Sequence, residues 1–327
     1  MEKLIKCSGA DKNYPVTAVY PNNMMVEITN ACNLKCSMCY HRKMRRGVGF
    51  MSRELFTKVI KEAKELNIQN VGLYSTGEAF LHPQVFDFIK IAKNNGIEYV
   101  YITTNGQALN KEKIGKIIES GLDSIKFSID AASKGIYEKT RTGGNWERLM
   151  EGIRLLRKAR DEVNSDLRIF GSFVVTKDNY KDLLMCQSVF SGLIDEGIFA
   201  PLDDQGGQQL DEINSMFPRS FMENFDKIFL PKEKWHPCNL LWNRFIVTYD
   251  GKLTICCSDY EAELIYGDIN RHGLKECWNN KKMKEFRKIH KEGRFELLPM
   301  CNRCNTPKID KKVLDKLISS KTFLINQ

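Results

Sequence analysis

The stretch that decides the fold is MMVEITNACNLKCSMCY (24–40), in which a short apolar run leads into three closely spaced cysteines. Cys32, Cys36 and Cys39 have the spacing C-x3-C-x2-C. Three thiolates in one loop can ligate three irons of a cubic 4Fe–4S cluster, which leaves the fourth iron for a small molecule with an amine and a carboxylate. The alternative is a zinc site with His41 as the fourth ligand, although a spacing of two residues after Cys39 is tight for zinc.

Downstream of this loop, strand-like and helix-like segments alternate as far as about residue 200. The first predicted helix follows a candidate N-cap at Ser52, and the last is predicted at 179–197. In each of these segments the apolar residues have helical spacing. Such alternation predicts parallel βαβ units and an α/β fold, a partial (β/α)6 TIM-like barrel with its chemistry at the carboxyl ends of the strands. The strands are predicted at 24–29, 70–75, 99–103, 124–130, 167–175 and 197–202.

The character of the chain changes after about residue 236, where cysteines become frequent. FIVTYDGKLTICC (245–257) predicts a β-hairpin that turns at Asp250-Gly251. The end of this hairpin and a later C-x2-C pair can bring four thiolates to a second metal site. Its predicted ligands are Cys238, Cys256, Cys301 and Cys304, with Cys257 as an alternative to Cys256. A zinc ribbon with the same four ligands is the competing interpretation.

These changes in pattern predict the domain organisation. An N-terminal extension precedes the barrel, and a connector without alternation separates the barrel from a small cysteine-rich domain that contains the hairpin. The last residues predict an amphipathic helix. The expected boundaries are 1–23 for the extension, 24–215 for the barrel, 216–235 for the connector, 236–310 for the cysteine-rich domain and 311–327 for the helical tail.

Composition limits the environment and the partners. The 327 residues contain no apolar run near the ~20 residues that cross a bilayer, and the N-terminus lacks a signal-peptide core, so we expect a cytoplasmic protein without membrane contact. Eleven cysteines in that compartment favour metal or redox chemistry over disulfides. The net charge of +9 suits a phosphorylated substrate or an acidic electron donor of the flavodoxin or ferredoxin type. Basic and aromatic residues are not interleaved, which argues against nucleic-acid binding.

The sequence resembles the radical S-adenosylmethionine (SAM) superfamily over about residues 24–305. The resemblance is carried by CNLKCSMC after a strand, STGEAFLHP (75–83), ITTNG (102–106), and SIKFSID (124–130) followed by YEKTRTGGNW. The second cysteine group resembles the SPASM auxiliary domain in its shortened, single-cluster "twitch" form. One departure is Met38, since the residue before the third cysteine is often aromatic in the family.

The resemblance implies which residues bind the cofactor. The segment at 75–78 matches the loop that binds the amino group of SAM, although the family often has Gly-Gly-Glu-Pro where this chain has Thr-Gly-Glu-Ala. Strand-end residues are expected to contact the carboxylate and ribose of the cofactor or to line the cavity, and an arginine is expected to clamp the carboxylate. The implied residues are Ser75, Thr76, Gly77, Glu78, Thr104, Asn105, Ser128, Asp130 and Arg141.

The same resemblance implies an enzyme that forms a 5′-deoxyadenosyl radical and removes hydrogen from a small molecule. In its compact size and cysteine layout, the chain most resembles 2-deoxy-scyllo-inosamine dehydrogenase-type enzymes. The resemblance implies that a sugar, cyclitol or other polyol is oxidised while an auxiliary 4Fe–4S cluster takes an electron. The alternatives are an epimerase in which Cys257 donates hydrogen, and maturation of a ribosomal peptide. Outside enzymes, the alternative is a zinc-binding nucleic-acid module. The sequence does not identify a general base.

Overall fold

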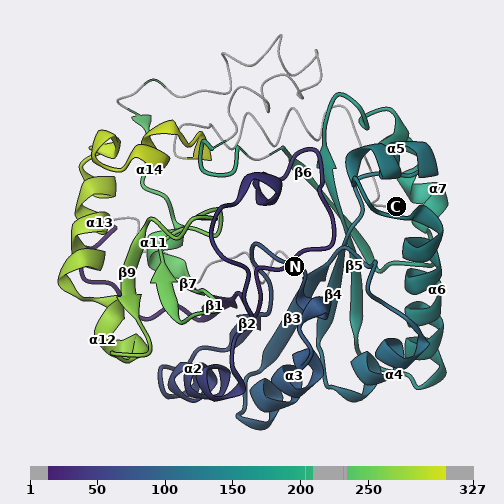
Figure 1. Ribbon diagram of the computed structural model, residues 1–327, viewed down its shortest axis with the longest axis horizontal. Helices are drawn as coiled ribbons and strands as arrows, with labels where there is room; N and C mark the ends of the chain where they lie inside the picture. The colour runs from purple at the N-terminus through teal and green to yellow at the C-terminus, as the bar shows by residue number, and fades with distance from the viewer. Residues whose placement is uncertain (1–13, 203, 209–230, 232–233, 307–327) are drawn as a thin grey trace.

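The computed structural model describes residues 14–202, 204–208, 231 and 234–306 (Figure 1). Its strands form a nine-stranded sheet in the order β6-β5-β4-β3-β2-β1-β7-β8-β9. Strands β1 to β6 pair in parallel with their neighbours, and the two edge strands of this open sheet are β6 and β9. The expected partial (β/α)6 barrel is therefore confirmed. Its strands are β1 Asn23–Val26, β2 Asn70–Gly72, β3 Tyr99–Thr104, β4 Ser124–Ser128, β5 Arg168–Val175 and β6 Glu196–Pro201.

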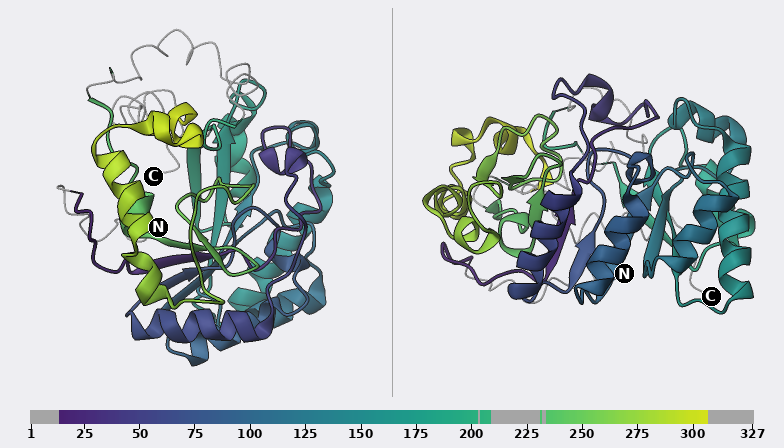
Figure 2. Two further views of the ribbon diagram at one scale, coloured as in Figure 1. Left: turned by 60° about the vertical axis from the view of Figure 1, so that its left-hand side comes forward. Right: turned by 60° about the horizontal axis from the view of Figure 1, so that its bottom comes forward.

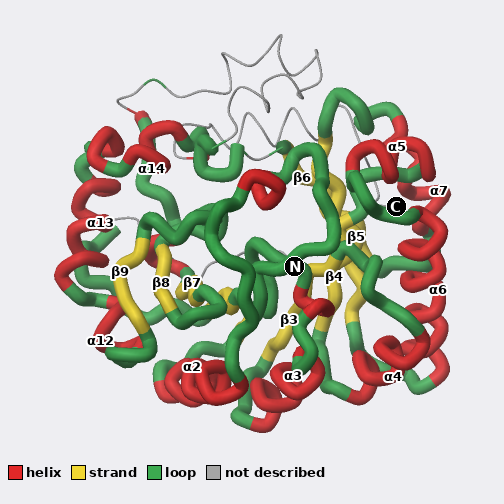
Figure 3. Tube along the Cα trace, in the orientation of Figure 1, coloured by secondary structure: helices red, strands yellow, loops and turns green. Residues whose placement is uncertain are grey.

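Helices cover the outer face of this sheet, as the red segments around the strands show (Figure 3). The first of them starts at the predicted N-cap, where the Ser52 side chain accepts a hydrogen bond from the backbone N–H of Leu55. The helices between strands are α2 Arg53–Glu65, α3 Val85–Asn94, α4 Lys111–Glu119, α5 Lys134–Thr140, α6 Trp146–Glu162 and α7 Cys186–Phe190, with short 3-10 turns η1 Tyr40–Lys43, η2 Ala79–Leu81 and η3 Asp182–Met185.

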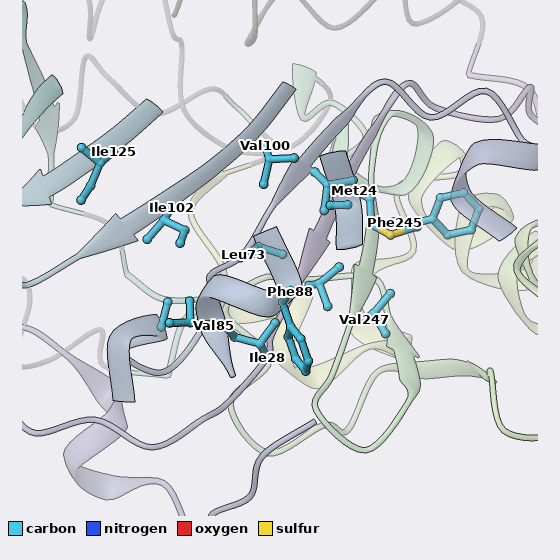
Figure 4. Packing of buried hydrophobic residues seen from close by; sticks show 14 of the residues in the cluster. Met24, Ile28, Leu73, Val85, Phe88, Val100, Ile102, Ile125, Phe245 and Val247 are labelled. Carbon is cyan, nitrogen blue, oxygen red and sulfur yellow. The ribbon is translucent and has the colours of Figure 1, made fainter. Parts of the chain in front are cut away.

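Side chains alternate between the two faces of the sheet. Val100 and Ile102 of β3 and Ile125 of β4 are fully buried in the layer between strands and helices, which also includes Phe88 of α3 (Figure 4). The intervening residues of the same strands point to the opposite, inner face of the barrel. Parallel pairing places Thr103 directly beside Lys126 on that face. The inner face is therefore polar as well as apolar, as a substrate cavity requires.

One predicted element differs in the structure. Residues 179–197 have helical spacing but form only the short η3 and α7. The Asn179 side chain donates to the carbonyl oxygens of Val174 and Asp130, and the Asp182 carboxylate accepts from the backbone N–H of Ala132. These bonds tie the beginning of the segment to the ends of β4 and β5, so its backbone cannot continue as one straight helix.

The C-terminal segment extends the barrel sheet. The predicted hairpin is confirmed, since β7 and β8 pair in antiparallel fashion. β7 also pairs in parallel with β1, a contact that the sequence pattern does not reveal. β8 then pairs with β9, which was not predicted. The elements of this segment are α11 Leu240–Asn243, β7 Phe245–Val247, β8 Lys252–Thr254, β9 Ile265–Asp268, α12 Leu274–Trp278, α13 Lys281–Lys291, η5 Phe295–Leu297 and α14 Pro299–Arg303.

The described part of the N-terminal extension packs against this C-terminal segment, and both views of Figure 2 place the purple start of the chain beside the yellow-green elements. The indole N–H of Trp242 donates to the carbonyl oxygen of Pro15, and that of Trp278 donates to Val19, each at 2.8 Å. The predicted tail helix at 311–327 and most of the 216–235 connector lie outside the described residues. In the part of the chain that the structure describes, no helix is long and apolar enough to cross a membrane.

Candidate active site

The loop after β1 gathers the first three cysteines in one buried cluster. Cys32, Cys36 and Cys39 pack with the apolar side chains of Leu34, Met38, Leu202 and Val174. Two backbone hydrogen bonds fix the loop to the segment after α5, from Lys35 N to Thr142 O and from Ser37 N to Thr140 O. Burial raises the pKa of the Cys32 thiol to about 12, with smaller contributions from Glu78 and the other two thiols. Burial also raises the pKa of the Cys36 thiol, a shift that the Arg141 guanidinium opposes, and a bound metal would favour the thiolate form of both.

Arg141 connects this loop to the end of β4. Its Nη1 lies 3.7 Å from the Cys36 Sγ, and its Nη2 lies 2.5 Å from Oδ2 of the fully buried Asp130. Asp130 adopts a positive φ of 61°, and its Oδ1 accepts from the backbone N–H of Val174 at 2.7 Å. The predicted residues Asp130 and Arg141 therefore lie together beside a cluster thiol. Ser128, two residues before Asp130, is half-buried on the inner face.

The loop after β2 is built around Glu78. One carboxylate oxygen accepts from the Thr104 hydroxyl at 2.6 Å, and the other accepts from the Asn105 backbone N–H at 2.7 Å. The Asn105 side chain in turn donates to the side-chain oxygen of Asn33, between two cysteines, at 2.8 Å. Burial raises the pKa of Glu78, and the hydrogen bonds from Asn105 and Thr104 oppose that shift. Three residues predicted to serve the cofactor thus form one network, in which Glu78 also holds the cysteine loop in place.

Gly77 is the point of closest approach between this loop and the cysteine loop. A Cβ at this position would overlap the Thr29 carbonyl oxygen and would lie 2.7 Å from that of Ala31. The neighbouring Glu78 N–H donates to the same Ala31 oxygen at 2.7 Å. Only glycine fits such contact with backbone atoms, so the sequence-based emphasis on Gly77 has a steric reason here.

We predict that Gly77→Ala destabilises the protein by about 1–3 kcal/mol, because the added methyl must displace backbone atoms. The matched control is Gly115→Ala in α4, where a Cβ would meet nothing within 4 Å. That substitution should stabilise the helix by about 0.5–1 kcal/mol, the usual gain of alanine over glycine. The midpoint of thermal unfolding, measured anaerobically for the cluster-loaded variants, checks both. Equal midpoints for the two variants would contradict the steric argument.

A buried ion pair, which the sequence pattern did not predict, lies at the carboxyl end of β1, near the cysteine loop. Glu27, at the end of β1, accepts from Nη2 of Arg46 at 2.8 Å and from the hydroxyl of Thr76. Arg46 also lies over the ring of Tyr249, at 5.4 Å from its centroid. Thr76, expected at the cofactor, therefore bonds to Glu27, while Ser75 is half-buried beside it. The signal for this network was the single carboxylate in the apolar run at 24–29.

The second cysteine group lies at the junction of α11, β8 and α14. Cys301 belongs to α14 and Cys304 caps its end, whereas Cys238 precedes α11 and Cys256 follows β8. Cys238 is close enough to affect the ionisation of Cys256, Cys301 and Cys304. Burial raises the pKa of Cys301 to about 12, with Cys238 adding to the shift. The pKa of Cys256 is also raised, first by its hydrogen bond with Cys257 and by burial, and further by the charges of Cys257, Cys238 and Cys304.

Cys257 occupies a different environment from Cys256. Besides its contact with Cys256, it is close enough to Tyr74, on the inner face of the barrel, to contribute to the raised pKa of that phenol. The burial of Tyr74 is the main cause of that shift, followed by Tyr101. Cys256 is thus near Cys238 and Cys304, whereas Cys257 is also near Tyr74 on the inner face of the barrel.

Contacts from the segment after Cys256 and from Gln205 reach the first cysteine loop. Tyr260, which follows the hairpin, has its hydroxyl 3.5 Å from the Cys39 Sγ and its ring 5.4 Å from that of Tyr40. Gln205 donates to the Met38 carbonyl oxygen at 3.1 Å and accepts from the Tyr40 backbone N–H at 2.7 Å. Gln208 continues this bridge to the carbonyl oxygen of Ser258. No cysteine or histidine pattern marks these residues, so the sequence analysis missed them.

The donor sets fit iron–sulfur clusters. Within residues 14–202, 204–208, 231 and 234–306, no three His, Cys, Asp or Glu side chains form a site for a single metal ion. The first loop offers three sulfurs in an apolar pocket, with the guanidinium of Arg141 beside one of them to offset negative charge. The second group contains four free cysteines, the number that a fully ligated cluster would need.

The comparisons with known proteins agree with this arrangement. Residues 26–185 match the model of the radical SAM superfamily, and residues 238–305 match SPASM, described as an iron–sulfur cluster-binding domain. The chain belongs to the radical SAM superfamily and is an enzyme of that class with a SPASM domain. It uses 4Fe–4S clusters and SAM, so the zinc interpretations of the two cysteine groups are wrong.

Particular relatives differ in what they do. The chain is 24% identical, over 312 residues that cover 86% of each protein, to the tungsten-containing aldehyde ferredoxin oxidoreductase cofactor-modifying protein of Pyrococcus furiosus. It is 26% identical over 256 residues to a probable GTP 3′,8-cyclase of Methanococcus maripaludis strain C7, covering 71% of this chain and 83% of the relative. Among solved structures, BtrN in complex with AdoMet and 2-DOIA superposes with a TM-score of 0.62 at 18% identity, covering 90% of this chain and 97% of that one. That likeness shows the fold.

Proposed function

We propose that this enzyme oxidises a hydroxyl-bearing carbon of a small polyol, sugar or cyclitol by two electrons. When bound, the first cluster and SAM supply a 5′-deoxyadenosyl radical that takes a hydrogen atom, and an auxiliary cluster supplies an acceptor for the second electron. The electrons for cofactor cleavage are expected from a flavodoxin or ferredoxin. The observation that carries the proposal is the contact of Tyr260, which follows Cys256 in the chain, with the Sγ of Cys39 in the first loop.

The contact at Tyr260 favours oxidation because it makes the second cysteine group part of the active-site region. The Tyr260 hydroxyl touches the Sγ of Cys39, and its ring packs on Tyr40. A domain that only braced the fold would have no need to reach a thiol of the first loop. Gln205 and Gln208 add polar contacts between the same two segments, so their separation is fixed. A fixed distance between the two cysteine groups suits electron transfer, because electron transfer requires no movement of a side chain.

The residues around the first loop would hold the cofactor. Cys32, Cys36 and Cys39 would ligate the cluster, and the backbone at Gly77 can approach the amino group closely. Arg141 places a positive charge beside Cys36 and would orient a carboxylate. Asp130 fixes the direction of that guanidinium, so its role is to position Arg141. Thr104 and Asn105 support Glu78 and act on the cofactor through it.

Incubation of the anaerobic, cluster-loaded enzyme with SAM, a reductant and candidate polyols tests the proposal. We expect a carbonyl product and 5′-deoxyadenosine in equal amounts, without hydrogen uptake from solvent at carbon. A substrate deuterated at the reacting carbon should transfer one deuterium to 5′-deoxyadenosine. If deuterium is transferred and the product keeps its hydroxyl group, the oxidation proposal is wrong.

A second candidate function is epimerisation, and the position of Cys257 favours it. This thiol is near Tyr74 on the inner face, where it can return a hydrogen atom to a substrate carbon. Epimerisation in deuterated water should place one deuterium in the product, and Cys257→Ala should abolish that uptake. The matched control is Cys277→Ala, whose thiol lies against Gly267 of β9, away from the barrel interior. Unchanged labelling in Cys257→Ala would exclude this thiol as the donor.

A further inference from the structure

We propose that the carboxylates of Asp204 and Asp259 lower the reduction potential of the second cluster, so that this cluster stays oxidised while the electron donor reduces the first. The inference rests on the function proposed above, in which the second cluster accepts an electron from the substrate. An acceptor that the donor had already reduced could not take that electron. The order in which the two clusters are reduced is therefore part of the chemistry, and the charges around each cluster contribute to that order.

Asp204 is buried beside Cys304, a predicted ligand of the second cluster. Asp204 is 5% exposed, and its Oδ2 accepts from the backbone N–H of Asn305, the residue after Cys304, at 2.5 Å. Its Oδ1 accepts from the N–H groups of Gly206 and Gly207 at 3.1 and 3.2 Å. A Cβ on Gly207 would lie 2.8 Å from the backbone nitrogen of Cys304, so the turn that holds Asp204 packs directly on the backbone of this predicted ligand.

Asp259 has a similar relation to Cys256. It is 4% exposed, and its backbone N–H donates to the Cys256 carbonyl oxygen at 3.3 Å. Its Oδ2 accepts from the hydroxyl of Thr254 at 2.6 Å and from the N–H of Leu264 at 2.8 Å, and its Oδ1 accepts from the N–H of Glu263 at 2.8 Å. These donors are uncharged, as are those of the other carboxylate. They hold each carboxylate in place without cancelling its charge.

Neither carboxylate has a cation as its partner. In the part of the chain that the structure describes, Asp204 and Asp259 bond to the uncharged groups named above and form no ion pair. Burial raises the pKa of the Cys304 thiol and Asp204 adds to the shift, whereas hydrogen bonds from Thr306 oppose it. For Cys301, burial and then Cys238 raise the pKa, and Asp259 adds to that rise. Both carboxylates therefore disfavour negative charge on the sulfurs of the second group.

The first cysteine loop has a different balance of charge. The Arg141 guanidinium lies 3.7 Å from the Cys36 Sγ and offsets one of two nearby carboxylates, those of Asp130 and Glu78. The first loop supplies three thiolates, whereas the second group would supply four and has two carboxylates without a cation. Reduction adds a negative charge to a cluster, and a buried negative charge nearby opposes it strongly because the surroundings screen little. Reduction is therefore less favourable at the second group.

A redox titration of the anaerobic, cluster-loaded enzyme, followed by electron paramagnetic resonance, tests this inference. Added SAM identifies the signal of the first cluster, because only that cluster has an iron without a protein ligand. We expect the SAM-insensitive signal of the wild type to appear at a more negative potential than the SAM-sensitive signal. Asp204→Asn and Asp259→Asn should each move the SAM-insensitive signal to a more positive potential and leave the other signal unchanged, because each removes one buried charge.

Two further variants separate charge from structure. Asp204→Glu keeps the charge and should retain the potential of the wild type. Glu296→Gln removes an exposed carboxylate of η5, five residues before Cys301, and should move neither signal because solvent and salt screen an exposed charge. Iron content shows whether each variant holds both clusters. If Asp204→Asn loses iron, Asp259→Asn provides the test, since its carboxylate belongs to a separate loop.

The inference is wrong if the second cluster of the wild type is reduced at the more positive potential, or if the asparagine variants that keep both clusters leave its potential unchanged. Product assays separate this failure from failure of the proposed function. A wild type that forms the carbonyl product, with variants that show no shift, loses only the effect of the two carboxylates. A wild type that shows the expected potentials and oxidises no polyol loses only the proposed oxidation.

Discussion

The Cys32/Cys36/Cys39→Ala variant is expected to lose formation of 5′-deoxyadenosine entirely and to lose about half of its iron. Two 4Fe–4S clusters correspond to about eight irons, of which about four should remain in the variant. The loss follows because these three thiols pack in one small apolar cluster that contains no other described cysteine. Iron and sulfide analysis after anaerobic reconstitution, together with chromatography of the nucleoside product, measures both effects.

The matched control is Cys186→Ala, which removes a buried core thiol of α7 that belongs to neither cysteine group. This variant should keep all of its iron and its cofactor cleavage. If the triple variant loses all iron, the second group does not hold a cluster and the proposed oxidation lacks an electron acceptor. If the triple variant keeps all of its iron, the first loop is not the cluster site.

Local sequence patterns predicted the parts of this fold that local forces determine. The strand at 124–130 was evident because its residues alternate, and the structure shows that alternation as Ile125 and Phe127 outside and Lys126 inside. The N-cap at Ser52 was evident because a short polar side chain preceded a helical apolar pattern. Glycine at 251 marked the hairpin, and its φ of 85° shows why glycine is favoured there.

Contacts between distant segments were not predictable in the same way. The parallel pairing of β7 with β1 joins residues more than 200 positions apart, and no periodicity within either strand specifies a partner. Tyr260 and Gln205 reach the cysteine loop for the same reason, through tertiary contacts only. The cysteines were recognisable as metal ligands because of their spacing.

The Cys301→Ala/Cys304→Ala variant is expected to separate cofactor cleavage from oxidation. Cys301 lies on α14 and Cys304 caps its end, whereas the first loop is held by bonds to the segment after α5 and by the Glu78 network. Removal of the second cluster should therefore leave the first site in place. We expect about four irons to remain and 5′-deoxyadenosine to form still, while the carbonyl product is lost.

The proposed electron transfer between the two clusters depends on the contact of Tyr260 with the first cysteine loop. Tyr260→Phe therefore provides the companion variant. Phenylalanine keeps the ring that packs on Tyr40 and removes only the hydroxyl near Cys39. Both clusters should remain, and oxidation should persist if fixed separation is what the bridge supplies. Loss of carbonyl in the double variant alone would identify the second cluster as the electron acceptor. Full carbonyl yield in the double variant would mean that the electron leaves by another route and that the second domain has a structural role.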